Sequence, residues 1–342
     1  MTELSQSSSS SVKLYWPIRQ TWTITEESLL RMIDHIDGGE NNATAELRSE
    51  LKAVEAVPNL KYQIHPQYRN AISGKRAFFL FLHLYTTKPV SRIHAKFTFS
   101  IKSENYLTQF NNVFDEDQNG WGDEICHVKE FFDSRRNFIV DGKFTVEMKG
   151  LLIFDDEEMQ KVVQLQASPL VQALWEREDK DFKIIVENEG TVLVHKYVLC
   201  ARSSFFESMF RAGREEAKTD TLKIVDFNLK TIEKAIEFFY DQNIFASLNI
   251  DDGFELLRFA DKYNIADLQD KLELHFTYLL SPSTVCQLAN GSISSNSIKF
   301  RQICFDFMMI CSKQNIPVEN LDILDKKFAA ELFQATFAPL SE

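Results

Sequence analysis

The sequence lacks paired cysteines and long apolar runs. Its five cysteines are odd in number, scattered and free of any CxxC pair, which suits a reducing cytosol or nucleus better than a secreted disulfide scaffold. No apolar run of about 18 residues occurs, and the start, "MTELSQSSSSSV", contains nothing like a signal peptide. We therefore expect a cytoplasmic or nuclear protein without membrane association, with a disordered leader over residues 1–11.

Clusters of basic residues are also missing. Lys and Arg number 38 against 50 Asp and Glu, which gives a net charge of −12. Neutralising a nucleic-acid backbone takes clustered Lys and Arg, so no nucleic-acid partner is expected. The 342 residues suffice for two domains, and 44% hydrophobic with 26% charged residues is typical of a globular chain. The 29 Phe favour β-structure or aromatic-rich packing.

The motifs of the common enzyme classes are absent, including GxxxxGK[ST], HExxH and GxSxG. His195 and Cys200 would need further ligands to hold zinc, and Cys126 with His127 lies in the other half of the chain. A Cys–His nucleophile pair stays open as an alternative, although no orienting residue is visible. The favoured interpretation makes His195 a polar residue at a strand-to-helix corner and Cys200 a small core side chain. We therefore expect no catalytic residue, metal or cofactor.

The first half of the chain predicts antiparallel strands. Residues 78–85, "FFLFLHLY", are nearly all apolar, and a turn with Pro89 follows. Residues 94–101, "HAKFTFSI", alternate apolar and polar side chains with a period of two, as do those of "DGKFTVEMKG" after the Asp141–Gly142 turn. "QTWTIT" is a further strand. The pattern favours a β-sandwich, although residues 40–57 look helical.

Three segments of this half resemble the MATH (TRAF-like) domain: "TWTI", "NGWGDEICHVKEFF" and "NFIVDGKFTVEMKG". The resemblance covers residues 12–154 and implies an eight-stranded antiparallel sandwich that binds peptides in a surface groove. It places five residues at groove positions: Leu82, Phe97, Trp121, Asp123 and Glu124. The two acidic residues favour basic peptides. Alternatively, they belong to a solvated loop and Trp121 belongs to the core.

The second half predicts strands mixed with short helices, followed by helices only. "DFKIIVENEGTVLVHK" is a hairpin turning at residues 188–190, and "TLKIV" is another short strand. Apolar residues recur at helical spacing over 226–242, 251–264 and 265–280. This order of elements indicates an α+β domain with a helical extension.

This half resembles a BTB/POZ domain over residues 179–280. The segments "DFKIIV", "VHKYVLCARSSFFESMF", "LKIVDFNLKTIEKAIEFFYDQ" and "LLRFADKYNIADLQDKLELHF" follow that family in order and spacing. Residues 155–178 would be a linker and entry helix, and 281–315 the helical pair that often follows a BTB domain. The tail at 316–342 has no assigned role.

A MATH domain joined to a BTB domain is the architecture of substrate adaptors for cullin-based ubiquitin ligases, the speckle-type POZ group among them. Core packing explains only two of the apolar side chains in "FFESMF", so the others are left for a partner. The resemblance implies a homodimer with Asp181, Lys196 and Phe205 at its interface.

The resemblance also implies a cullin contact at Phe210, Arg214 and Glu216. Related adaptors carry a hydrophobic-x-Glu triplet here, whereas this chain has Arg214 in the hydrophobic place. The favoured prediction is a non-catalytic adaptor that binds substrate peptides and a cullin. The alternative is a dimeric protein-binding scaffold that recruits no cullin.

Overall fold

The computed structural model describes residues 13–37, 47–55, 57, 59–86, 92–155 and 168–337. The expected leader, the turn at Pro89 and residues 156–167 of the expected linker lie outside these residues. The described residues divide into two compact units. The first takes those within Met1–Val162, Phe305–Val318 and Lys326–Glu342, and the second those within Val163–Cys304 and Glu319–Asp325.

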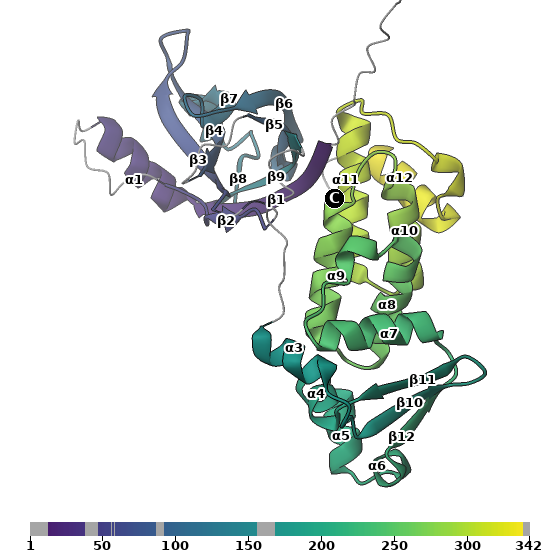
Figure 1. The fold of residues 1–342 in the computed structure, drawn as a ribbon. Helices are drawn as coiled ribbons and strands as arrows, with labels where there is room; N and C mark the ends of the chain where they lie inside the picture. Colours follow the sequence, from purple (N-terminus) through teal and green to yellow (C-terminus); the bar gives the residue numbers. More distant parts are fainter. Residues whose placement is uncertain are drawn as a thin grey trace, which may run out of the picture. The chain divides into compact units, whose positions relative to one another are not determined.

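The first unit is built on two antiparallel sheets (Figure 1). One has the order β1-β9-β5-β6, with β8 paired to β9, and the other has the order β2-β3-β4-β7. The strands of the first sheet are β1 (Lys13–Thr25), β5 (Ile93–Ile101), β6 (Tyr106–Phe114), β8 (Ile139–Val140) and β9 (Lys143–Asp155). Those of the second are β2 (Lys52–Ala53), β3 (Lys61–Asn70), β4 (Arg76–Tyr85) and β7 (Gly120–His127). The antiparallel sandwich is confirmed; its described residues form nine strands in place of the expected eight, and two of these, β2 and β8, are pairings of only two residues.

Side-chain alternation builds the core of this unit. On β5, Ala95, Phe97, Phe99 and Ile101 are all fully buried, whereas His94 just before them is exposed. Phe144, Val146 and Met148 of β9 are buried as well, as the alternating sequence predicts.

Besides the short α2 (Val128–Phe131), the sandwich carries one longer helix among its described residues, which lies earlier than predicted. It is α1 (Glu26–Asp37), which buries Leu29 and Met32. Residues 47–55 of the segment expected to be helical instead form an irregular stretch and β2, so the prediction is wrong there. Tertiary contacts override the helix-favouring composition: the Ser49 hydroxyl accepts a hydrogen bond from Ile64 N at 2.8 Å, and Val54 is buried.

The second unit contains a three-stranded sheet of order β11-β10-β12. β10 (Phe182–Val186) and β11 (Gly190–Val194) form the predicted hairpin, with Asn188 left-handed at φ 63° in its turn. β12 (Thr221–Ile224) runs parallel to β10. The helices before β12 are α3 (Pro169–Glu176), α4 (Lys196–Arg202), α5 (Ser204–Arg211) and α6 (Glu215–Thr219).

Helices alone follow β12, as predicted. They are α7 (Leu229–Phe239), α8 (Ile250–Lys262), α9 (Ala266–Tyr278), α10 (Val285–Ser294) and α11 (Ile298–Lys313), whose second half falls in the first unit. The stretch without an assigned role contains α12 (Lys326–Phe337). The predicted fold class, a β-sandwich followed by an α+β domain with a helical extension, is therefore confirmed.

Ser203 joins α4 to α5. Its side chain caps α5 by accepting a hydrogen bond from Phe206 N at 3.2 Å, and it donates one to the Tyr263 carbonyl just after α8. Only 2% of Ser203 is exposed, so both bonds are shielded from water. This one hydroxyl therefore fixes where α5 starts and ties it to α8.

Ser203→Ala removes both bonds and leaves the Tyr263 carbonyl unsatisfied. We expect a loss of roughly 1–2 kcal/mol in the free energy of unfolding, measured by urea denaturation. Ser208→Ala is the control, because this serine of the same helix is exposed. Equal stability of the two variants would contradict the assignment.

Candidate functional site

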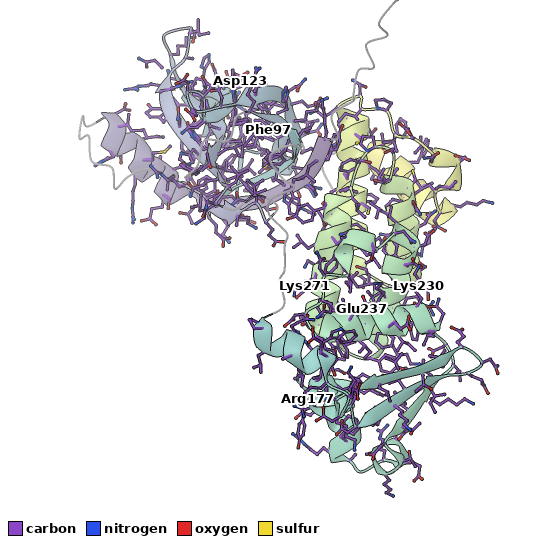
Figure 2. The ribbon with its side chains drawn as sticks, in the orientation of Figure 1. Phe97, Asp123, Arg177, Lys230, Glu237 and Lys271 are labelled. Carbon is purple, nitrogen blue, oxygen red and sulfur yellow. The ribbon has the colours of Figure 1, made fainter. Side chains whose placement is uncertain are left out.

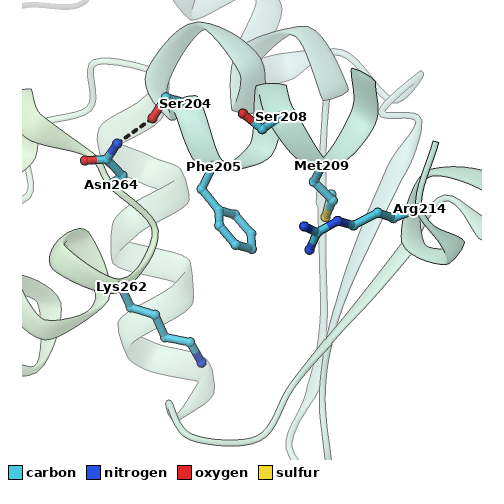
Figure 3. Close-up of a pocket in the computed structure, with 7 residues that line it drawn as sticks. All are labelled: Ser204, Phe205, Ser208, Met209, Arg214, Lys262 and Asn264. Atoms are coloured by element: carbon cyan, nitrogen blue, oxygen red, sulfur yellow. Dashed lines mark hydrogen bonds between the residues drawn. The ribbon is translucent and has the colours of Figure 1, made fainter. Parts of the chain in front are cut away.

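A pocket of about 280 Å³ lies beside α5 in the second unit (Figure 3). We call it the α5 pocket. Its lining comes from α5, from the start of α6 and from the end of α8: Ser204, Phe205, Ser208, Met209, Arg214, Lys262 and Asn264.

The apolar wall of this pocket is formed by two residues of α5, Phe205 and Met209. Phe206 and Met209 are buried, whereas Phe205 and Phe210 are half-buried, so the core accounts for two of the four as predicted. The Phe205 ring meets Tyr263 edge-on with centroids 5.2 Å apart, which holds it at the pocket. The α5 pocket can therefore take an apolar side chain.

The rim of the α5 pocket is cationic. Arg214 precedes α6, is exposed and forms no ion pair with any described carboxylate. Lys262 lies opposite and pairs with Asp226 at 2.7 Å. An apolar group flanked by a carboxylate would suit this combination of wall and rim.

The three predicted cullin-contact residues do not line one surface. Arg214 alone lines the α5 pocket. Phe210 turns toward the sheet, where its ring meets Phe182 edge-on at 5.0 Å. Glu216 is half-buried on α6.

Asp181 and Lys196, predicted at a dimer interface, lie close together. The Lys196 backbone N donates to Asp181 Oδ1 at 2.9 Å. The Lys196 ammonium, however, pairs with Asp220, and Asp181 is exposed, so the two do not form a buried ion pair. Phe205, the third predicted interface residue, lines the α5 pocket.

His195 and Cys200 have separate structural environments. His195 Nδ1 lies 2.6 Å from the Tyr240 hydroxyl, and Nε2 lies 3.4 Å from Asp179, so both nitrogens have partners at the corner between β11 and α4. Burial raises the pKa of the Cys200 thiol, which lowers its thiolate fraction at neutral pH. Cys200 is half-buried, so it is less enclosed than predicted. No set of three or more potential metal ligands occurs among the described residues.

The helix predicted as an entry helix is apolar and has no buried residue. α3, "PLVQALWE", has no buried residue, and Leu170 is 78% exposed. Trp175 attaches this helix to Tyr240, with ring centroids 5.1 Å apart. The sequence shows this feature, because the helix has no charged residue before Glu176 and therefore lacks a polar face to expose to water.

Two of the predicted groove residues lie in the sandwich core. Leu82 on β4 and Phe97 on β5 (labelled in Figure 2) have no exposed surface, so neither can touch a peptide directly, and their prediction as groove residues is corrected. The Phe110 ring of β6 stacks on Phe97 with centroids 4.7 Å apart and covers it. Leu82 and Phe97 therefore lie beneath the protein surface.

The other three predicted groove residues lie on β7, beside β6. Trp121 Nε1 donates to the Val113 carbonyl of β6 at 2.9 Å and joins the two sheets at this edge. Asp123 is exposed (Figure 2), and burial together with the nearby Asp123 charge raises the pKa of the Tyr106 hydroxyl. Glu124 pairs with His127 at 3.2 Å. The edge between β6 and β7 is therefore acidic.

Comparison with known proteins agrees with this geometry. The family model described as "BTB/POZ domain" matches residues 171–279. This stretch is a BTB/POZ domain. The match includes most of α3, the α5 pocket and all three strands of the second unit. The BTB domain is thus the part that carries both the exposed apolar helix and the pocket.

Longer similarity extends into the sandwich. BTB and MATH domain-containing protein 40 of Caenorhabditis elegans is 22% identical over 323 residues, covering 85% of this chain and 77% of that protein. BTB and MATH domain-containing protein 42 of the same organism is 27% identical over 221 residues, covering 63% and 52%. These matches support a MATH domain followed by a BTB domain, and with it a role in protein–protein interaction.

One solved structure is similar to part of this chain. A solved structure of the BTB domain of human gigaxonin is similar over 32% of this chain and 94% of that chain, with 17% identity and a TM-score of 0.27. Among the helices in the described residues, none has the length and apolar character needed to cross a bilayer.

Trp121→Phe removes the hydrogen bond that joins β7 to β6 while keeping an aromatic ring. We expect a loss of about 1 kcal/mol in the free energy of unfolding and faster amide exchange at Val113 and its neighbours on β6. Trp22→Phe is the matched control, because Trp22 makes no hydrogen bond to a described residue through its indole. Equal exchange on β6 in both variants would refute this role.

Proposed function

We propose that this chain is a non-catalytic substrate adaptor. In this proposal the MATH unit binds a segment of the substrate, and the BTB unit dimerises and recruits a cullin. Other subunits of the ligase transfer ubiquitin. The observation that carries the proposal is the α5 pocket, an apolar cavity with a cationic rim on a domain that serves protein–protein interaction.

The α5 pocket supports cullin recruitment by its shape and chemistry. Phe205 and Met209 offer an apolar site for one side chain, and a well-packed apolar anchor is the kind of contact that dominates binding energy. Arg214 and Lys262 at the rim favour a partner with nearby carboxylates.

The α3 helix supports homodimerisation. An apolar helix with no buried residue gains by covering its exposed face with a second copy. The dimer would hold two substrate-binding units together. Two weak sites on one dimer raise the effective affinity by about 10²–10⁴ when one substrate spans both.

The acidic edge between β6 and β7 supports binding of a basic peptide segment. Asp123 offers an exposed carboxylate beside Trp121, and Phe110, stacked on Phe97, supplies apolar area. An adaptor of this kind would act in the cytoplasm or nucleus, and five cysteines without a disulfide suit that reducing compartment.

A dimeric scaffold without a cullin is the second candidate. Arg214 favours it, because a charged side chain stands where related adaptors place a hydrophobic one, at the rim of the α5 pocket. Burying that guanidinium against an apolar surface without a carboxylate would weaken the contact.

Leu170→Glu places a charge on the exposed face of α3. We expect the dimer to dissociate at micromolar concentration, shown by sedimentation as a species near 39.6 kDa, while the wild type sediments at twice that mass. Leu321→Glu is the control, because Leu321 is also exposed but lies outside α3. A monomeric wild type would refute dimerisation through α3.

Binding of a purified cullin amino-terminal domain, measured by titration calorimetry, tests recruitment. We expect Phe205→Glu to weaken binding by more than about tenfold, a change of about 1.4 kcal/mol, because it puts a charge into the α5 pocket. Arg214→Leu should also weaken binding, because it removes a cation from the rim of the pocket. Phe333→Glu, which changes an exposed Phe of α12, is the matched control. A wild type that dimerises but binds no cullin would favour the scaffold.

A further inference from the structure

The α5 pocket contains more hydrogen-bond donors than an apolar anchor from a partner would use (Figure 3). Five of its seven lining residues are polar or cationic: Ser204, Ser208, Arg214, Lys262 and Asn264. None of the seven is an acid, although the chain contains 50 Asp and Glu and has a net charge of −12. The polar part of this pocket therefore suits a negatively charged ligand.

Two helix ends place polar side chains at the pocket. Gly213 follows α5 with left-handed backbone at φ 60°, and its N–H donates to the Phe210 carbonyl at 3.1 Å, so the helix ends directly before Arg214. Asn264 follows α8 with the same backbone conformation, at φ 51°, which asparagine adopts more readily than most residues. Local backbone geometry thus fixes the positions of Arg214 and Asn264.

Several of the donors at the pocket have hydrogens left for a ligand. The Ser208 hydroxyl and the Arg214 guanidinium make no hydrogen bond to any described residue. The Ser204 hydroxyl accepts a hydrogen bond from the Asn264 amide, so its own hydrogen stays available. Lys262 pairs with Asp226 at 2.7 Å. The pocket can therefore donate to one ligand from both α5 and the residue before α6.

A phosphate ester matches this set of donors better than a carboxylate does. A phosphorylated hydroxyl carries a charge of about −1.5 to −2 and presents three acceptor oxygens, whereas a carboxylate presents only two. The planar fork of the Arg214 guanidinium can donate to two phosphate oxygens at once. The hydroxyls of Ser204 and Ser208 can then donate to the remaining oxygen.

The apolar wall selects the group that carries the phosphate. Phe205 is half-buried, and its edge-on contact with Tyr263 leaves the rest of the ring available to a ligand. Met209 also lines the pocket, and a thioether packs well against aromatic rings. A cavity of about 280 Å³ has room for one further ring. An aromatic phosphate ester therefore uses both parts of the pocket, whereas a phosphorylated serine would leave the apolar wall uncovered.

We propose that the α5 pocket binds a phosphotyrosine side chain of a partner protein. The ring of the ligand packs on Phe205 and Met209, and Arg214 binds its phosphate. This binding needs no cullin. Competition between the phosphotyrosine and a cullin for the pocket rests on the proposed function, and it would make recruitment of the ligase depend on a phosphorylated partner.

The test uses the full chain and a fluorescein-labelled peptide with one phosphotyrosine between glycines, with binding followed by fluorescence anisotropy. We expect the wild type to bind this peptide at least tenfold more tightly than the same peptide with tyrosine or with phosphoserine. Arg214→Leu should weaken binding at least tenfold, and the fold does not depend on this side chain because it makes no cap bond to α6. Arg211→Leu is the matched control. It removes the same charge from an exposed residue of α5 that pairs with Glu207 and does not line the pocket, so binding should weaken less than twofold.

Ser208→Glu is a second variant that acts without removing a cation. It places a carboxylate at an exposed helix position in the lining of the pocket, and it should weaken peptide binding at least tenfold with the melting temperature unchanged. No binding by the wild type, equal binding of the phosphoserine peptide, or equal losses with Arg214→Leu and Arg211→Leu would overturn the proposal. Inorganic phosphate that binds as tightly as the phosphotyrosine peptide would overturn it in favour of a site for the free anion.

The cullin titration separates this inference from the proposed function. A chain that binds the cullin domain but not the phosphotyrosine peptide would overturn the inference and leave the adaptor proposal standing. A chain that binds the peptide but no cullin would support the inference and favour the scaffold. Where both bind, we expect saturating peptide to weaken cullin binding at least tenfold, and an unchanged cullin affinity would refute competition for the pocket.

Discussion

A side chain that fills the core cannot also contact a partner, and two short segments of this chain divide their apolar residues between these tasks. On α5, Phe206 packs inward, whereas Phe205 lines the α5 pocket. On β4, the inward leucines leave Phe81 and its neighbouring rings outside. The helical and strand periods fix this division, so a shift of one residue in either segment would exchange core and surface.

The sequence predicts the division where only one face is apolar. On β5 polar and apolar residues alternate, and the inward side could be read from the sequence. On β4 both faces carry large apolar residues, so "FFLFLHLY" shows a strand but not which side is inward. The resemblance to the MATH domain, and not this pattern, places Leu82 in a surface groove, whereas the structure buries it in the core.

The α5 pocket shows a different limit of prediction. Its walls include Lys262 and Asn264, which lie far along the chain from α5. No local sequence pattern shows that the end of α8 lies beside α5. The corner position of His195 was predictable because it depends on the order of strand and helix around it, although its partner Tyr240 lies far along the chain. The ion-pair partner of Lys196 could not be predicted in this way. Its ammonium pairs with Asp220, just before β12, and not with Asp181.

The parallel pairing of β10 with β12 sets an order of assembly. The hairpin of β10 and β11 closes over a few residues, whereas β12 must return across the whole stretch that contains α4, α5 and α6. During synthesis these helices leave the ribosome before the strand and the helices that enclose them. The docking cavity is thus a late product of folding, so an incompletely made chain exposes its phenylalanines before it can use them.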